Sequence, residues 1–353
     1  LVDRHGKLDA PYFGRMAAQF ASLHASGWQP VLVTSGAVAS GVGILGLSER
    51  PPGLPESQAL AAIGQITLAQ RWEAALAAHG LVAAQVLLTY DDFTHRERYL
   101  NLAATFRALF EFGAVPVINE NDTVAVEELT VGDNDRLSAL VATQLGADRL
   151  VLLTDIDGMY DADPRTNPAA QRIREIPVVT TRILAAAGGA GARGRGGMRS
   201  KIEAARLASG AGVTTTICLA REAEVLIRII AGDDLGTRIP GRGDKADSRR
   251  RWLAVARRVK GHLHVDAGAA TALISKGRSL LPAGVVRVEG RFERGDTIAI
   301  VNPEGEEIAR GLASLSAVEL TAIAGKRLAA AADVLGYALP KAAVHRDDLL
   351  VLI

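Results

Sequence analysis

Short apolar runs alternate with segments of helical periodicity between residues 9 and 231, and this alternation limits the fold more than any other feature of the sequence. The apolar runs cover 30–34, 82–89, 114–118, 149–154 and 213–219, and helical patterns cover 9–27, 57–80, 96–112, 134–145 and 200–209. Short strands joined by helices form parallel sheets that are covered on both faces. The sequence therefore predicts an α/β fold with an open, mostly parallel sheet sandwiched by helices. Ligands of such sheets bind where the strands end, at the carboxyl edge.

The pattern changes near residue 232. Residues 240–260 carry eight basic and two acidic side chains, a net charge of +6, and are typical of a basic connector. Beyond them, alternating runs at 285–289 and 297–300 lie between turn signals, which indicates a small β-rich domain. A chain of 353 residues is longer than a domain with a single hydrophobic core usually is, so two domains are expected. We predict a first domain at 1–240, a linker at 241–260 and a second domain at 261–353.

Composition excludes several classes of protein. Forty basic and 39 acidic side chains give a net charge of +1, too close to neutral for a protein that binds polyanions through its overall charge. No apolar run approaches the roughly 20 residues that a membrane helix needs, and no secretory leader is visible. Cys218 is the single cysteine, so an internal disulfide is excluded, and no Cys/His spacing suggests zinc. We expect a cytoplasmic protein that does not act in a membrane.

Polar residues follow the predicted strands at the edge where a site is expected. Ser35 and Gly36 end one strand and open a helix, where backbone N–H groups can meet an anion. Four polar residues at 119–122 end another strand. Residues 132–135 lie at the start of the helix predicted at 134–145, with more Asn and Asp than one cap requires. Plain capping turns explain the first two clusters equally simply.

Residues 193–201 form a glycine-rich loop with four cationic side chains and no acid, and they lead into a helix. Glycines allow close approach to phosphate oxygens, and a lysine supplies a mobile charge. Lys7 and Lys201 are the only lysines before residue 245, which favours a specific role for Lys201. A solvated basic loop is the alternative. The Gly-Lys-Ser/Thr ending of a P-loop is absent from this segment. The Gly-x-Gly-x-x-Gly pattern of dinucleotide-binding proteins occurs at 41–46 but is a chance match. It does not directly follow a predicted strand, and no acidic residue that could bind a ribose lies about 20 positions further on.

Five motifs follow one another along the chain: Val33-Thr34-Ser35-Gly36-Ala37, Val117-Ile118-Asn119-Glu120-Asn121-Asp122, Val131-Gly132-Asp133-Asn134-Asp135, Leu152-Leu153-Thr154-Asp155 with Gly158-Met159-Tyr160, and Gly196-Gly197-Met198-Arg199-Ser200-Lys201. In this order they resemble the motifs of the glutamate 5-kinase family in the amino-acid kinase superfamily. Segments 268–273, 279–284 and 343–348 are similar to the PUA domain that ends this family's members. The resemblance covers nearly the whole chain and implies the amino-acid kinase fold with a small PUA-like domain at the C-terminus.

The resemblance implies a function: transfer of a phosphoryl group from ATP to the γ-carboxylate of L-glutamate, the first step of proline biosynthesis, with Mg²⁺ as cofactor. It also implies inhibition by L-proline and a homodimer or homotetramer. Residues implied to bind glutamate are Ser35, Gly36, Asp122 and Asn134, and those implied to bind ATP are Thr154, Asp155, Arg195, Gly196, Gly197, Met198, Arg199, Ser200 and Lys201. We expect Lys201 and Asp135 to be catalytic, and we assign no Mg²⁺ ligand.

One departure from the family concerns the N-terminus. The family begins with a strand that leads to a Lys-x-Gly-Ser/Thr turn, whereas this chain opens at Leu1-Val2-Asp3, just after that point. A sheet without this strand is expected to expose a neighbouring strand edge.

Two other functions remain open from the sequence. The first is a different kinase of the superfamily, acting on acetylglutamate, aspartate, carbamate or a nucleotide. The second is RNA binding through the PUA-like domain and the basic linker. Residues 260–353 contain only two aromatic residues, Phe292 and Tyr337, so base stacking has little support.

Overall fold

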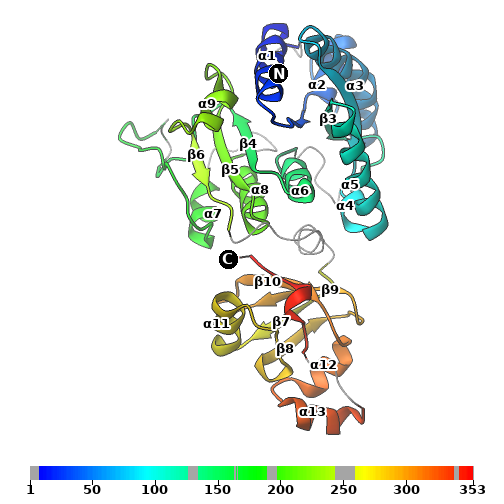
Figure 1. Ribbon diagram of the computed structural model, residues 1–353, viewed down its shortest axis with the longest axis vertical. Helices are drawn as coiled ribbons and strands as arrows, with labels where there is room; N and C mark the ends of the chain where they lie inside the picture. Colours follow the sequence, from blue (N-terminus) through cyan, green and yellow to red (C-terminus); the bar gives the residue numbers. More distant parts are fainter. Residues whose placement is uncertain are drawn as a thin grey trace.

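The computed structural model describes residues 8–125, 134–162, 164, 166–188, 197–242, 259–337 and 342–352 (Figure 1). The helices of the first domain are α1 (Ala10–Ala25), α2 (Ala37–Ile44), α3 (Leu54–Ala77), α4 (Asp91–Thr94), α5 (Arg96–Glu111), α6 (Asn134–Leu145), α7 (Thr181–Ala187), α8 (Met198–Gly210) and α9 (Val225–Ala231). Its strands are β1 (Leu32–Val33), β2 (Val82–Leu88), β3 (Ala114–Glu120), β4 (Arg149–Thr154), β5 (Thr214–Leu219) and β6 (Thr237–Ile239). The alternation read from the sequence is confirmed.

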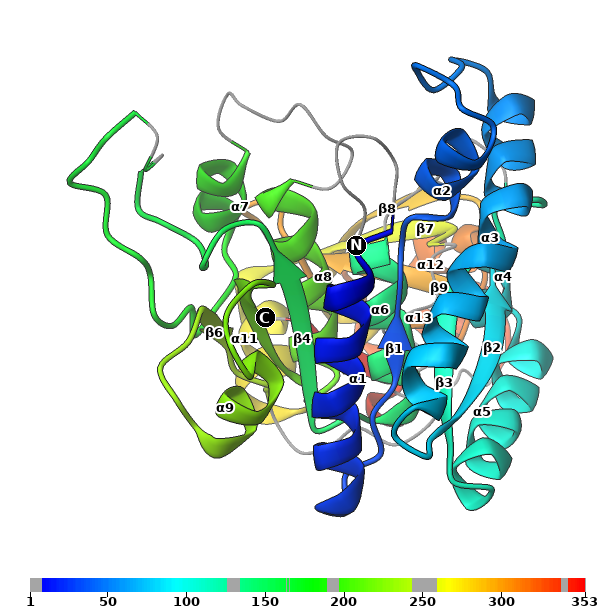
Figure 2. The same ribbon diagram turned by 90° about the horizontal axis from the view of Figure 1, so that it is seen from above.

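The strands of the first domain form two three-stranded sheets, ordered β1-β3-β2 and β4-β5-β6. The first sheet is wholly parallel, whereas β6 runs antiparallel to β5. The expectation of a mostly parallel sheet is therefore confirmed, with the strands divided between two ladders. Strands β1 and β4 each stand at the edge of their sheet, and Figure 2 shows them on either side of α1.

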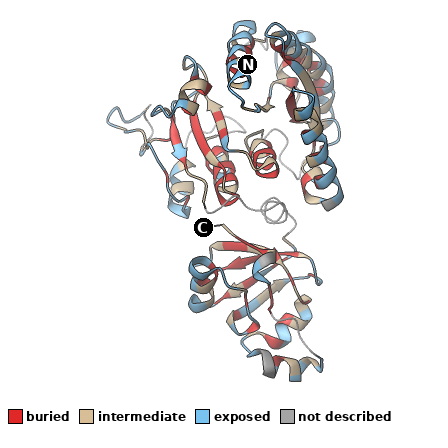
Figure 3. Cartoon of the chain, viewed as in Figure 1, coloured by how far each residue is buried: buried red, intermediate tan, exposed pale blue. Residues whose placement is uncertain are grey.

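Helices on both faces join the two sheets into one layer. On one face, Phe13, Met16 and Phe20 of α1 share a core with residues of β3 and β4, among them Val117 and Val151. On the opposite face, α6 contributes to two cores, one against each sheet. Figure 3 shows the resulting burial of β4, β5 and α8. Each buried large apolar side chain contributes about 1.5–3 kcal/mol, so the shared cores hold the two sheets together.

Local signals in the sequence account for the bounds of α1. Asp9 precedes the helix, and its side chain accepts a hydrogen bond from the Tyr12 N–H. Gly27 follows the helix with φ +84°, a conformation that favours glycine. The predicted helix and its buried face are confirmed.

Helices α2 and α3 cross at two glycines. A Cβ on Gly41 would overlap the Leu60 carbonyl, and a Cβ on Gly64 would overlap the Ala37 carbonyl. Gly41 belongs to the Gly-x-Gly-x-x-Gly pattern, so this glycine serves helix packing. The two glycines therefore allow α3 to pack directly against the first turn of α2.

The C-terminal domain contains a five-stranded sheet of order β11-β10-β9-β7-β8. Its elements are β7 (Gly261–Val265), α11 (Ala267–Lys276), η2 (Pro282–Gly284), β8 (Val285–Gly290), β9 (Thr297–Val301), β10 (Glu307–Leu312), α12 (Ala317–Ile323), α13 (Leu328–Leu335), η3 (Arg346–Asp348) and β11 (Leu349–Val351). The strand runs predicted at 285–289 and 297–300 are confirmed by β8 and β9. Leu312, Leu350 and Leu352 pack against Ala211, just after α8, and this contact joins the two domains.

Across the parts of the chain that the structure describes, no helix combines the length and the apolar character needed to cross a membrane.

Candidate functional site

The carboxyl end of β1 leads directly into the first turn of α2. Gly36 adopts φ +106° at the start of α2, and Ser35 beside it is exposed. The first N–H groups of a helix have no partner within the helix, so this turn can hydrogen-bond an anionic group. Glycine is required at position 36 because side chains strongly disfavour this backbone conformation.

Hydrogen bonds of Thr34, the residue after β1, hold this turn in place. Its backbone N–H donates to the Ile118 carbonyl at 2.9 Å, and its hydroxyl accepts from the Trp72 indole N–H at 3.0 Å. Thr34 is only 2% exposed. The end of β1 is therefore fixed to both β3 and α3.

Asn134, the first residue of α6, lies against this anchored turn. Its Nδ2 donates to the Thr34 carbonyl at 2.9 Å and to Asn119 Oδ1 at 3.3 Å. Asn119 Nδ2 in turn donates to Gln65 Oε1 at 2.8 Å. Asn134 Oδ1 is buried and has no hydrogen-bond partner among the described residues. A buried acceptor without a partner is costly, so this oxygen is suited to receive a donor from a ligand.

Asp135, the next residue along α6, contacts the start of α8. Its carboxylate lies 2.9 Å from Lys201 Nζ and accepts from the Ser200 hydroxyl at 2.8 Å. The side chains of Lys201 and Asp135 are 10% and 16% exposed, so water screens this ion pair weakly. The Ser200 hydroxyl also lies 2.9 Å from the Gly197 carbonyl, which fixes it within the first turn of α8. The structure thus brings Asp135, Ser200 and Lys201 together.

Asp122 lies in the segment after β3. Burial raises the pKa of the Asp122 carboxyl, and the nearby Arg50 guanidinium opposes this rise only in part. Arg50 itself donates to the Ser57 hydroxyl at 2.8 and 3.0 Å. No described hydrogen bond joins Asp122 to Ser35 or Asn134. A partly buried carboxylate of this kind is stabilised when a cationic ligand group approaches it.

The described residues that are expected to hold a nucleotide lie at the end of β4 and at the start of α8. Thr154 ends β4, and its hydroxyl donates to the exposed carboxylate of Asp155 at 3.1 Å. Met198, the first residue of α8, packs against the core that α8 shares with β4 and β5. Arg199 is exposed and forms an ion pair with Glu203 at 3.0 Å. No described contact links these side chains to Lys201.

Part of the glycine-rich loop lies outside the described residues. Arg195 and Gly196 belong to that part, and the description resumes at Gly197, the residue that precedes α8. Within the described ranges, no group of three or more His, Cys, Asp or Glu side chains could hold a metal ion.

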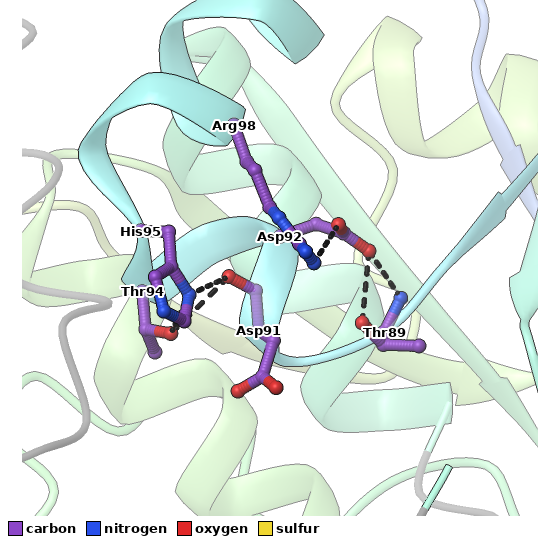
Figure 4. Close-up of polar contacts among 6 residues, drawn as sticks. All are labelled: Thr89, Asp91, Asp92, Thr94, His95 and Arg98. Atoms are coloured by element: carbon purple, nitrogen blue, oxygen red, sulfur yellow. Dashed lines mark hydrogen bonds and ion pairs between the residues drawn. The ribbon is translucent and has the colours of Figure 1, made fainter. Parts of the chain in front are cut away.

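A polar turn fixes the end of β2 beside the site (Figure 4). Asp92 accepts from the backbone N–H of Thr89 at 2.7 Å and from its hydroxyl at 2.9 Å. The adjacent Leu88 carbonyl accepts from the backbone N–H of Asn121 at 2.8 Å. The turn after β2 therefore supports the segment that carries Asp122.

Sequence reasoning missed three residues of this region. Asn119 stands in a polar run that signalled a site, but the assignments there fell on Asp122 alone. Gln65 and Arg50 lie in or before a helix that carries no motif, so nothing in the sequence pointed to them.

Comparison with known proteins resolves the family. Residues 2–219 match the model of the amino acid kinase family, and residues 261–335 match that of the PUA domain. The chain is 46% identical to a glutamate 5-kinase of Burkholderia cenocepacia and 49% identical to one of Pseudomonas fluorescens, over 100% of this chain and 95% of each relative. The chain belongs to the glutamate 5-kinase family. It is therefore a kinase, and membership of the family implies ATP as its co-substrate.

Among solved structures, a UMP kinase from Bacillus anthracis is similar at 14% identity and a TM-score of 0.47, covering 69% of this chain and 92% of that one. This likeness is too weak to add to the assignment. The expected fold class, an amino-acid kinase domain with a PUA domain at the C-terminus, is confirmed by the family models and the described strands.

Proposed function

We propose that this kinase transfers the γ-phosphoryl group of ATP to the γ-carboxylate of L-glutamate and forms γ-glutamyl phosphate, the first step of proline biosynthesis. The names of its relatives support this activity. A carboxylate oxygen of glutamate attacks the γ-phosphorus, the bond from that phosphorus to the bridging oxygen breaks, and ADP leaves.

One observation carries the proposal: the neighbouring residues Asn134 and Asp135 point to different halves of the site. Asn134 bonds to the end of β1 and to β3, whereas Asp135 bonds to Lys201 at the start of α8. An acceptor substrate at the first sheet and a phosphoryl group at α8 would therefore meet at the N-terminus of α6. Positive partial charge at a helix N-terminus favours the anionic groups that react there.

The reaction makes modest demands on these groups. A γ-carboxylate is already ionised at pH 7, so it needs no general base. Its difficulty is approaching another anion, which requires positioning and cations that neutralise charge on the transferred group. We assign the second task to Lys201, which Asp135 holds in place.

The same geometry suits the two ends of glutamate. The α2 turn at Ser35 and Gly36 offers hydroxyl and N–H donors for a carboxylate. The Asp122 carboxylate and Asn134 Oδ1, which has no partner among the described residues, offer acceptors for an α-ammonium group. Thr154 and Asp155 at the end of β4, together with the segment from Arg195 to Lys201, are our proposed ATP site.

The proposed Mg²⁺ would accompany ATP. Kinases bind Mg²⁺ through one or two carboxylates together with the substrate's phosphates. Asp155 is exposed at the end of β4 and is the described carboxylate that best fits this task, whereas Asp135 is engaged by Lys201. When bound, Mg²⁺ would neutralise phosphate charge.

Further properties belong to the proposal. We place the kinase domain at 1–240, the linker at 241–260 and the PUA domain at 261–353. We also propose a cytoplasmic homodimer or homotetramer that L-proline inhibits at the glutamate site.

A substrate panel tests the proposed function. The enzyme, ATP and Mg²⁺ are incubated with glutamate, acetylglutamate, aspartate, carbamate or UMP, and ADP release is followed. Glutamate should give the highest kcat/KM, and proline should raise the apparent KM for glutamate. A higher kcat/KM for another member of the panel would assign the enzyme to that substrate instead.

A further inference from the structure

We propose that Gln65 is a positioning residue for glutamate binding, acting through Asn119 on the amide of Asn134. This inference rests on the proposed function and names a residue of α3 to which no motif points. We call Gln65 of α3, Asn119 of β3 and Asn134 of α6 the relay. Each side chain is hydrogen-bonded to the next, so the orientation of one amide determines that of its neighbour.

The direction of each amide follows from its partners. Gln65 Oε1 lies 2.8 Å from Asn119 Nδ2, so the Asn119 oxygen faces the other way, toward Asn134. Asn134 Nδ2 then finds two acceptors, Asn119 Oδ1 at 3.3 Å and the Thr34 carbonyl at 2.9 Å, which occupy both of its hydrogens. The remaining atom, Asn134 Oδ1, is presented as an acceptor.

Packing holds the start of the relay in place. Gly64, the residue before Gln65, lies so close to the Ala37 carbonyl that no side chain fits there. Asn119 is 3% exposed, so water cannot readily replace Gln65 as the acceptor for its Nδ2. A buried donor that loses its partner rotates toward another acceptor or pays a desolvation penalty. Either response moves the oxygen against which Asn134 is aligned.

The orientation of Asn134 matters for the chemistry of the ligand. An oxygen at this position attracts an α-ammonium group, whereas an amide NH₂ would repel it. The relay would therefore favour an amino acid over a dicarboxylate that lacks the amino group. Gln65 acts on binding and has no direct part in phosphoryl transfer.

Steady-state kinetics of the full-length enzyme test the relay. Gln65→Leu removes the acceptor and should raise the KM for glutamate about tenfold, the effect of one buried hydrogen bond. Its kcat and its KM for ATP should stay within about twofold of the parent values. Gln65→Glu keeps an oxygen acceptor for Asn119 and should restore the KM for glutamate to within about threefold of the parent.

The matched control is Gln70→Leu, the same change at an exposed position of the same helix, which should leave all three constants unchanged. An unchanged KM for glutamate in Gln65→Leu would overturn the relay, as would equal loss in Gln65→Leu and Gln65→Glu. Failure of the parent enzyme to phosphorylate glutamate would instead overturn the proposed function. Glutamate binding by calorimetry gives a second readout for variants with low turnover.

Discussion

At the scale of residues, the ion pair of Lys201 and Asp135 is the most sheltered charge in the described site. Lys201→Ala should lower kcat about 100- to 1,000-fold, because the cation that offsets charge on the transferred group is lost. Arg206→Ala, which removes a cation further along α8, should retain normal turnover. A Lys201→Ala enzyme with near-normal kcat would contradict the assigned role.

The lower activity expected of Lys201→Ala must be distinguished from a loss of stability of the fold. Removing one partner of a buried ion pair destabilises a protein by about 3–5 kcal/mol. The double variant Lys201→Met with Asp135→Asn removes both charges. It should unfold closer to the parent temperature in calorimetry than Lys201→Ala does, yet remain inactive.

Asp122 gives a prediction about pH. Burial raises its pKa in the folded state, so the folded protein favours the protonated carboxyl. The stabilising contribution of that proton is present at acid pH and is lost as the pH rises through the folded pKa. Asp122→Asn should therefore be more stable than the parent at pH 7 in denaturant unfolding, and this advantage should shrink toward pH 4. Equal stability at both values of pH would contradict the prediction.

At the scale of elements, the crossing of α2 and α3 depends on Gly64. Gly64→Ala places a methyl group against the Ala37 carbonyl in the first turn of α2, so the helices must separate. We expect a loss of about 1–3 kcal/mol in the free energy of unfolding, together with weaker glutamate binding. Gly14→Ala is the control, because its added methyl group meets no atom within 4 Å. A neutral Gly64→Ala would show that the helices move apart at little cost.

The turn after β2 offers a second matched pair of variants. Asp92 accepts two hydrogen bonds from Thr89 (Figure 4). The side chain of the neighbouring, exposed Asp91 makes no described hydrogen bond, whereas its backbone carbonyl accepts from the Thr94 hydroxyl and from the His95 N–H. Asp92→Ala should destabilise the protein by about 0.5–1.5 kcal/mol in thermal unfolding, because the hydrogen bonds from Thr89 are lost. Asp91→Ala should change stability by less than about 0.5 kcal/mol. Similar effects of the two substitutions would contradict the role of Asp92 in fixing the turn after β2.

At the scale of the whole molecule, local patterns were good guides to the elements. Helix α6 and strand β4 have the predicted bounds, because a clear polar boundary precedes each apolar period. The division of the strands into two sheets was not predictable, since hydrogen bonding between strands depends on contacts distant in sequence. The two α6 residues, Asn134 and Asp135, were predicted as site residues from their motif. Gln65 was not, because its role depends on one contact with a residue 54 positions away.

Trapping the acyl phosphate product shows whether this kinase phosphorylates the γ-carboxylate of glutamate. The enzyme is incubated with ATP, Mg²⁺, L-glutamate and hydroxylamine, and the hydroxamate is identified by mass spectrometry. We expect γ-glutamyl hydroxamate in proportion to the ADP released, and at least about 100-fold slower formation of it with Lys201→Ala. ADP release without this hydroxamate, or a hydroxamate at the α-carboxyl carbon, would contradict the proposed function.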